Sequence, residues 1–236
     1  MKIIPVIDYL QNNVVLAKHG QRERYQPINS KLCTSTKAAH VIESILSITD
    51  FNTIYIADLD SIEKNQLNTD IWPEIFSSYP EIEFWLDIGS KASQWNEIFY
   101  GIDNVKPVIG SESFISVEQL TSTLNTLKQC SPILSLDFKD SQLLGPQTLF
   151  SEFQEWPQNI ILLNLNQVGS LQGPDFKTLE KLARKLPGSC NIFLGGGIRN
   201  KEDLRQASQR NVSGVLIASA LHNKAITQKD LSEFTC

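Results

Sequence analysis

Eight short apolar runs, separated by segments with helical periodicity, constrain the fold of this chain more than any other feature. The runs are Ile3–Ile7, Thr53–Ala57, Glu83–Leu86, Lys106–Ile109, Ile133–Leu136, Asn159–Leu163, Asn191–Leu194 and Gly214–Ile217. Strands that alternate with helices form a parallel sheet, and eight such units close it into a barrel. The sequence therefore predicts an α/β fold, a single (βα)8 TIM barrel over residues 1–236. An open doubly wound sheet is the alternative.

Helix signals lie between the runs, as this fold requires. Leucines at 120, 124 and 127 recur at helical spacing, and Ser116 followed three residues later by Gln119 predicts a capping box at the start of that helix. A second helical pattern begins at Phe176 and ends before Gly188.

The strand ends repeat between the two halves of the chain. The first run ends as PVID at Asp8 and the fifth as LSLD at Asp137, while DIGS around Gly89 resembles LGGG around Gly196. The pattern predicts a half-barrel internal repeat whose two aspartates face each other across one mouth.

The stretch FLGGGIR predicts a phosphate-binding loop. Glycine lets backbone N–H groups approach an anion without a Cβ in the way, and the helical pattern that opens at Asn200 adds a positive dipole end. The eighth strand ends in Ala218 and Ser219, small residues suited to the other side of the same site. We expect Gly196, Gly197, Ala218 and Ser219 to bind phosphate. The alternative is an ordinary glycine turn.

Carboxylates are predicted to carry the chemistry. Active sites of such barrels gather at the carboxyl ends of the strands, where Asp8 and Asp137 are placed. Two aspartates on opposite sides of a ligand can remove a proton from one atom and deliver one to another, as an aldose–ketose isomerisation requires. We expect Asp8 and Asp137 to be catalytic, and Asp58 and Asp60 to be structural.

A long segment after the first strand is predicted to form a substrate loop. It carries Lys18, Arg22, Arg24 and Tyr25, which supply donors and a ring for an anionic ligand. A solvated charged loop is the alternative, and a Schiff base at Lys18 is a further one.

Composition excludes several functional classes. The net charge is −5 and no dense basic block occurs, which argues against nucleic acid as a partner. The four cysteines lack C-x-x-C spacing and the three histidines lack i, i+4 spacing, so we expect neither a disulfide framework nor a metal site. No apolar run is long enough for a membrane span. We expect a cytoplasmic monomer or small homo-oligomer whose partner is a small phosphorylated metabolite.

These residues resemble a known family, the histidine-biosynthesis barrels that include ProFAR isomerase and the cyclase of imidazole glycerol phosphate synthase. The matching segments, in chain order, are IIPVID, ADLD, LSLDFKD, GSLQGPD, LGGGIRNKEDL and GVLIASAL. The resemblance implies a half-barrel duplication, a ligand with a phosphate at each end, no cofactor, and an Amadori rearrangement driven by carboxylates. It also implies that Asp8 is the general base and Asp137 a supporting carboxylate.

Three departures from that family stand in the predicted site. The family's general acid is the last aspartate of a segment after the sixth strand, and Val168 occupies its place here. The third-strand phosphate loop, normally three glycines, is Asp87-Ile88-Gly89, where a charged carboxylate repels phosphate. Ala218 replaces the glycine that ends the eighth strand.

The first loop points to a particular branch of the family. Its sequence HGQRERYQP is similar to an uncharacterised branch found in archaea and in bacteria with methanopterin-linked one-carbon metabolism. The sequence thus leaves three readings open: a diverged, cofactor-independent isomerase or lyase, an authentic ProFAR isomerase in which Asp137 acts as the acid, and a non-catalytic barrel that binds a phosphorylated ligand.

Overall fold

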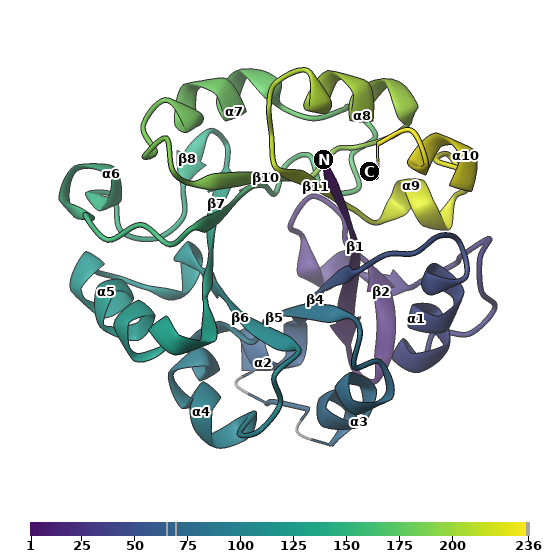
Figure 1. Ribbon diagram of the computed structural model, residues 1–236, viewed down its shortest axis with the longest axis horizontal. Helices are drawn as coiled ribbons and strands as arrows, with labels where there is room; N and C mark the ends of the chain where they lie inside the picture. The colour runs from purple at the N-terminus through teal and green to yellow at the C-terminus, as the bar shows by residue number, and fades with distance from the viewer. Residues whose placement is uncertain (65, 69, 235–236) are drawn as a thin grey trace.

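Eight parallel strands close into a barrel in the computed structural model, which describes residues 1–64, 66–68 and 70–234. The first strand closes the barrel by pairing with the last, with Lys2 opposite Gly214 and Pro5 opposite Ile217. Figure 1 shows the closed ring from one end. The strands are β1 (Lys2–Leu10), β4 (Thr53–Asp58), β5 (Glu83–Asp87), β6 (Val105–Gly110), β7 (Ile133–Lys139), β9 (Asn159–Asn164), β10 (Asn191–Gly195) and β11 (Gly214–Ile217). The predicted barrel and all eight predicted strands are confirmed, and the open sheet is excluded.

Helices surround the barrel (Figure 1). They are α1 (Ala38–Leu46), α2 (Leu59–Lys64), α3 (Ile71–Ser78), α4 (Trp95–Ile98), α5 (Val117–Thr126), α6 (Leu149–Glu152), α7 (Phe176–Ala183), α8 (Lys201–Ser208), α9 (Ser219–His222) and α10 (Gln228–Leu231). Across the described part of the chain, no helix combines the length and apolar character needed to cross a membrane. The Ser116 hydroxyl caps α5 by accepting from the Gln119 amide at 3.3 Å, but the Gln119 side chain accepts from Ile115, so only half of the predicted capping box forms.

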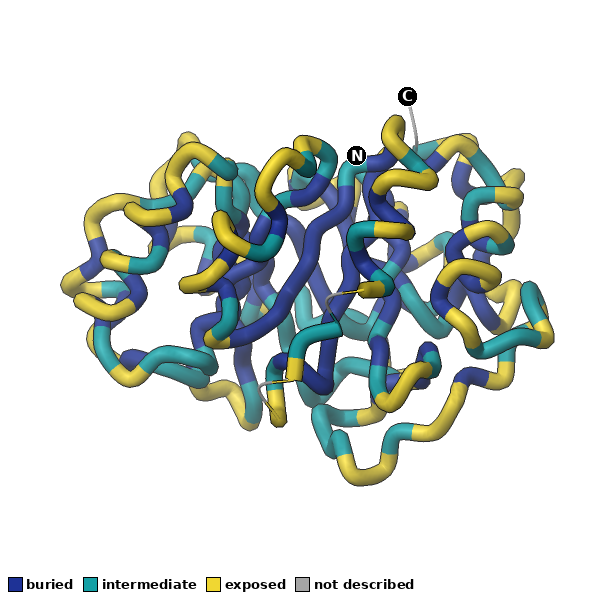
Figure 2. Tube along the Cα trace, turned by 90° about the horizontal axis from the view of Figure 1, so that it is seen from below, coloured by how far each residue is buried: buried dark blue, intermediate teal, exposed yellow. Residues whose placement is uncertain are grey.

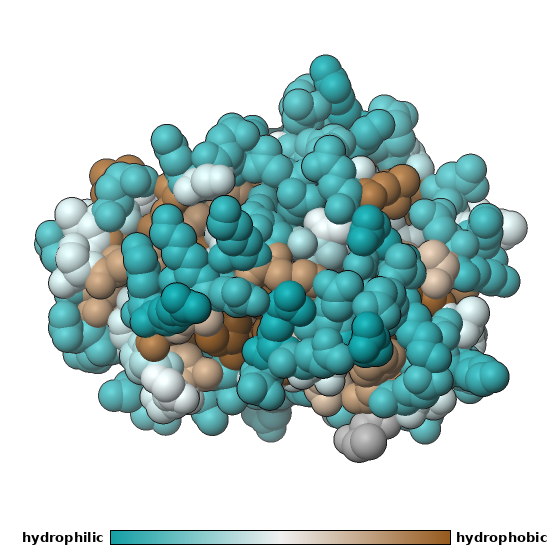
Figure 3. Space-filling model, turned by 90° about the horizontal axis from the view of Figure 1, so that it is seen from above, coloured by the Kyte–Doolittle hydropathy of each residue, from teal (hydrophilic) through white to brown (hydrophobic). Residues whose placement is uncertain are grey.

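The period-two alternation of the strands separates two apolar layers. Ile3 and Ile7 belong to the large core between the barrel and its helices, whereas Ile4 packs inside the barrel. On β4 and β5, Tyr55 and Trp85 likewise point inward. The buried strands cross the middle of the molecule and the helices expose their outer faces (Figure 2). The surface in Figure 3 is mainly hydrophilic, with apolar side chains in separate small patches.

Trp85 fills the barrel interior. Only 1% of its surface is exposed, its ring meets Phe193 edge-on at 4.8 Å, and its Nε1 donates to Glu83 at the start of the same strand. The indole therefore points toward the amino ends of the strands.

The segment after β1 is more ordered than a simple loop. It forms β2 (Asn13–Leu16), antiparallel to β1, and β3 (Gln26–Pro27), antiparallel to β2, with a 3-10 turn at Arg22–Arg24 between them. This hairpin rises beside the mouth of the barrel and holds the predicted loop residues on a defined frame.

Asp58 is structural, as predicted. It is fully buried at the end of β4, where it accepts hydrogen bonds from the Ser61 amide at 3.1 Å and from Trp72 Nε1 at 2.7 Å. Asp60 is also structural, because it accepts from the Gln11 amide at 2.6 Å and pairs with Lys64. Neither carboxylate lines the cavity described below.

We predict that Asp58→Ala destabilises the fold. The substitution leaves the buried Trp72 N–H and Ser61 N–H without their acceptor, which costs about 2 to 4 kcal/mol of unfolding free energy. Urea denaturation measures the change. Asp50→Ala, which removes an exposed aspartate, is the matched control and should change stability by less than about 0.5 kcal/mol. Equal stability of the two variants would contradict the structural role of Asp58.

Candidate functional site

A cavity of about 210 Å³ opens at the carboxyl ends of the barrel strands. Its walls come from strand ends on both sides of the barrel and from the hairpin after β1. Polar lining residues are Asp8, Arg22, Tyr25, Tyr55, Asp87, Glu112, Asp137, Lys139, Gln167, Arg199 and Ser219. Both predicted catalytic residues and all four predicted phosphate-binding residues line this one cavity.

Asp8 enters the cavity from the end of β1. Its neighbours in the sheet are Val15 on β2 and Ala57 on β4, which supply no donor side chain. Burial raises the pKa of Asp8 to about 7, and the Arg22 guanidinium opposes this rise only in part. A carboxyl group with this pKa is suited to proton transfer near neutral pH.

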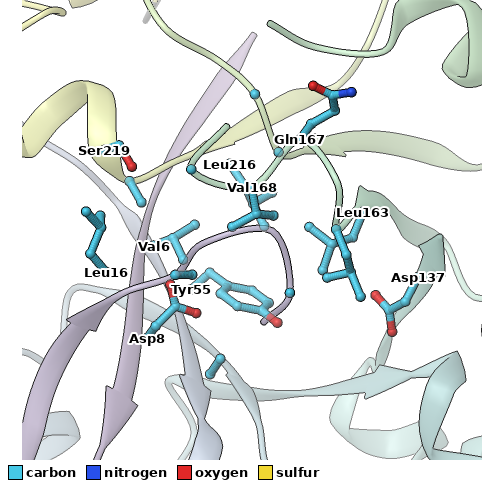
Figure 4. A pocket seen from close by; sticks show the side chains of 18 of the residues that line it. Val6, Asp8, Leu16, Tyr55, Asp137, Leu163, Gln167, Val168, Leu216 and Ser219 are labelled. Atoms are coloured by element: carbon cyan, nitrogen blue, oxygen red, sulfur yellow. The ribbon is translucent and has the colours of Figure 1, made fainter. Parts of the chain in front are cut away.

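Asp137 lies on the opposite side of the cavity from Asp8, with the Tyr55 ring between them (Figure 4). It is 4% exposed, and its Oδ1 accepts from the Ser135 hydroxyl at 2.7 Å. Burial and the nearby Glu112 carboxylate raise the pKa of Asp137 well above its usual value. A raised pKa favours the protonated carboxyl group, which makes Asp137 a candidate acid.

Asp87 joins Asp137 on this side of the cavity. A Cβ on Gly110 would lie 3.1 Å from Asp137 Oδ2 and 3.5 Å from Asp87 Oδ2, so the two carboxylates approach the same bare backbone position. Burial raises the pKa of Asp87 to about 6, although the Gly89 amide donates to it at 2.9 Å. The Tyr55 hydroxyl also contacts Asp87, at 3.4 Å.

The hairpin beside the mouth of the barrel places Arg22 in the wall of the cavity. Arg22 pairs with Glu112 after β6 at 2.5 Å and with Glu63 on α2 at 3.6 Å. Tyr25 also lines the cavity, whereas Lys18 and Arg24 are exposed and do not. Of the four predicted loop residues, two therefore reach the cavity, and the guanidinium among them is already paired with carboxylates.

The hairpin is tied to the far side of the mouth by the segment after β9. The His19 amide donates to the Val168 carbonyl at 2.8 Å, and His19 Nδ1 lies 3.1 Å from the Asn166 carbonyl oxygen. Gly169 fits against Ala17, because a Cβ there would lie 2.3 Å from the Ala17 carbonyl oxygen. Ala17, Val168 and Gly169, which these contacts hold together, all line the cavity.

Val168 projects into the cavity from that segment (Figure 4). A Cβ on Gly196 would lie 3.5 Å from its Cγ2, so its side chain lies beside the glycine loop. Leu163 and Leu216 line the neighbouring wall. The position that we aligned with the family's general acid is therefore part of an apolar surface.

The glycine loop has the open backbone that we expected of a phosphate site. Gly196 and Gly197 have φ of +93° and +92°, and a Cβ on Gly197 would lie 2.5 Å from the Gly173 carbonyl oxygen. Within the described residues, no acceptor is recorded for the Gly197 amide or the Ser219 hydroxyl. Ala218 has φ of −125°, outside the left-handed region that favours glycine.

The N-terminus of α8 is capped from within the protein. Asn200 accepts from the Asp203 amide at 3.1 Å, and Asp203 in turn accepts from the Arg199 amide and guanidinium. The donors left for an anion are therefore those of the glycine loop and Ser219, and the expected contribution of this helix end is reduced.

In the first half of the chain, the donors that correspond to those of the glycine loop and Ser219 are hydrogen-bonded within the protein. The Gly89 amide donates to Asp87, and the Ser111 hydroxyl donates to the Leu144 carbonyl at 2.7 Å and accepts from the Asp137 amide. Gly89 is the counterpart of Gly196 in the predicted repeat, and Ser111 follows β6 as Ser219 follows β11. The two ends of the cavity therefore differ in chemistry.

Sequence reasoning missed Glu112 and Tyr55 and treated Asp87 only as an obstacle to phosphate. A period-two count along the strands was the available signal, because Asp87 lies two residues after the inward-facing Trp85, as Asp137 lies two residues after Ser135. Glu112 carried no signal, because only the fold brings it to Arg22.

Comparison with known proteins agrees with this architecture. The family model described as "Histidine biosynthesis protein" matches residues 2–227. An uncharacterized protein of Methanocaldococcus jannaschii, MJ0703, is 30% identical over 98% of this chain and 97% of its own length.

Two isomerases are more distant relatives. The 1-(5-phosphoribosyl)-5-((5-phosphoribosylamino)methylideneamino) imidazole-4-carboxamide isomerase of Clostridioides difficile, a ProFAR isomerase, is 23% identical over 99% of this chain and 98% of its own length. The enzyme of the same name from Clostridium beijerinckii is 23% identical over 100% of this chain and 98% of its own length. The barrel, the order of the motifs and the near-complete match place this chain in the histidine-biosynthesis protein family.

Proposed function

We propose that this protein binds a small phosphate ester in the cavity and catalyses proton transfer on it with Asp8 and Asp137. The phosphate is held by Gly196, Gly197 and Ser219, with Ala218 beside them. The observation that carries the proposal is the placement of two carboxyl groups with raised pKa values on opposite walls of the cavity that the glycine loop also lines.

The two carboxyl groups have different parts in the proposed chemistry. Asp8, with a pKa of about 7, accepts a proton from the ligand in its ionised form. Asp137, whose pKa is raised above its usual value by burial and Glu112, donates a proton to a second ligand atom. One proton is taken and one is given, so the reaction is an isomerisation, or a lyase reaction in which the donated proton leaves with the departing group. The chain's own carboxyl groups supply both steps, and no cofactor is part of the proposal.

Two alternatives remain as outcomes of experiment. An authentic ProFAR isomerase would need Asp137 to replace the acid absent at Val168 and would need a second phosphate at the end of the cavity lined by Asp87. A non-catalytic barrel would bind the phosphate ester and be indifferent to the ionisation of Asp8.

The metabolic setting stays a prediction from the first loop. The relative in Methanocaldococcus jannaschii is named as uncharacterized, so its name assigns no activity to this chain. A role linked to methanopterin-dependent one-carbon metabolism is consistent with the HGQRERYQP segment. We propose the same setting together with a cytoplasmic location and a monomer or small homo-oligomer.

We predict that Ser219→Ala weakens binding of inorganic phosphate about tenfold, since a hydrogen bond to a charged group contributes about 1.5 kcal/mol or more. Isothermal titration calorimetry measures the change. Ser213→Ala, which removes a half-buried hydroxyl just before β11 at the opposite end of the barrel, is the control and should bind phosphate like the parent protein. Equal affinities for the two variants would remove Ser219 from the site.

We predict that Asp8→Asn stabilises the protein at high pH. The folded-state pKa of about 7 lies above the ordinary aspartate value of 3.8, so folded Asp8 retains a proton that the unfolded chain has lost. The parent protein therefore loses stability as pH rises from about 4 to 7, by at most about 4 kcal/mol. Asparagine does not titrate and escapes this loss. Denaturant unfolding at pH 4 and pH 8 compares the two proteins, and a gap that does not widen with pH would contradict the raised pKa.

We predict no ProFAR isomerase turnover by the purified, folded protein. Val168 cannot donate a proton, and the end of the cavity opposite the glycine loop carries carboxylates in place of phosphate donors. The assay follows the isomerised product, and Asp8→Asn controls for contaminating host enzyme. Turnover that Asp8→Asn abolishes would show an authentic isomerase and overturn the diverged function.

A further inference from the structure

The cavity has three chemically distinct zones. The glycine loop and Ser219 form one end, and Asp87, Asp137 and Glu112 form the other. An apolar wall that includes Val168 lies between them (Figure 4). A ligand that fits all three zones must change character along its length.

The acidic end disfavours a second phosphate, because its donors are already used and its free groups are carboxyl groups. The Gly89 amide and the Ser111 hydroxyl, which would be the donors for one, are used by Asp87, by the Leu144 carbonyl and by the Asp137 amide. A phosphate placed there would face carboxylates at short range, which is repulsive in a partly buried site. This argument uses the geometry of the first half and extends the phosphate site proposed in the second half.

Among the described residues, no cation forms an ion pair with Asp87 or Asp137. Arg22 is held by Glu112 and Glu63, and Arg199 by Asp203. Lys139 lines the cavity, yet among the described residues it forms no ion pair with Asp87 or Asp137. Asp137 is more than nine-tenths buried and lines the cavity, with Asp87 and Glu112 as neighbouring carboxylates.

We infer that the ligand is a phosphate monoester that bears a protonated amine at its far end, with an apolar segment between the two charges. The inference rests on the proposed phosphate site. The phosphate lies at Gly196, Gly197 and Ser219, the apolar segment lies against Val168, and the ammonium group donates to the Asp87 carboxylate. An ammonium group has donors only, which suits a wall whose free groups are carboxylate oxygens.

The raised pKa values of these acids are consistent with this occupant. Burial raises the pKa of Asp87 to about 6, and burial with the Glu112 charge raises the pKa of Asp137 well above its usual value. A bound ammonium supplies an opposite charge in the same partly buried space and favours the ionised form of Asp87. A hydroxyl group in its place donates one hydrogen bond and no charge, and we expect it to bind more weakly.

The test compares three matched series by calorimetry at neutral pH: linear aminoalkyl phosphates, hydroxyalkyl phosphates and alkyl bisphosphates, each of increasing chain length, with inorganic phosphate as reference. We expect the best aminoalkyl phosphate to bind about tenfold or more tightly than its hydroxyl analogue, because hydrogen bonds to charged partners are the stronger ones. Bisphosphates should bind no more tightly than inorganic phosphate.

Two variants test whether the preference for an amine over a hydroxyl group comes from the acidic end of the cavity. Asp87→Asn should reduce the preference for the amine at least severalfold while leaving the affinity for inorganic phosphate within about twofold. Asp103→Asn, which removes a carboxylate before β6 at the other end of the barrel, should change neither.

The outcomes separate the two proposals. Binding of inorganic phosphate that Ser219→Ala weakens, with no preference for the amine or with tighter binding of bisphosphates, overturns the ammonium inference and leaves the phosphate site standing. Failure of every compound to bind, inorganic phosphate included, overturns both.

Discussion

Closure of the barrel by the pairing of β1 with β11 is the constraint on which the site depends. It brings the end of the first strand, with Asp8, onto the same ring as the end of the last strand, where Ser219 follows. Alternation along each strand then decides which side chains enter the ring. Ile4 points inward, and Asp8 lies four residues further along β1 on the same side. The same spacing rule places Asp87 and Asp137 inside, so a packed apolar interior continues upward into a cavity lined by carboxylates.

The two ends of that cavity differ in the hydrogen-bond donors that they leave free for a ligand. In the second half, Gly197 and Ser219 keep donors that the described protein does not use. In the first half, the donors at Gly89 and Ser111 are bound to the protein itself. The ProFAR isomerases among the relatives are named for a compound with two phosphoribosyl groups. In this chain the two ends of the cavity differ in their free donors, and the apolar side chain of Val168 lines the space between them.

The fold was predictable because local and global signals agree. All eight strands were located within a few residues from apolar runs, and Ser116 marked the start of α5. The catalytic candidates followed from their place at strand ends. What could not be predicted were contacts between segments distant in sequence. The Arg22 side chain could bind a ligand or a protein carboxylate, and only the fold brings Glu112 to it. The half-barrel repeat stays a prediction.

The central claim is that one end of the cavity binds phosphate and the other does not. The most direct measurement is a crystal structure of the protein grown or soaked with inorganic phosphate. We predict one phosphate on the amides of the glycine loop and the Ser219 hydroxyl, with Asp87 still bound to the Gly89 amide. A phosphate at Gly89 and Ser111, whether alone or together with one at Ser219, would contradict the account, because it would show that the first-half donors remain open to a ligand.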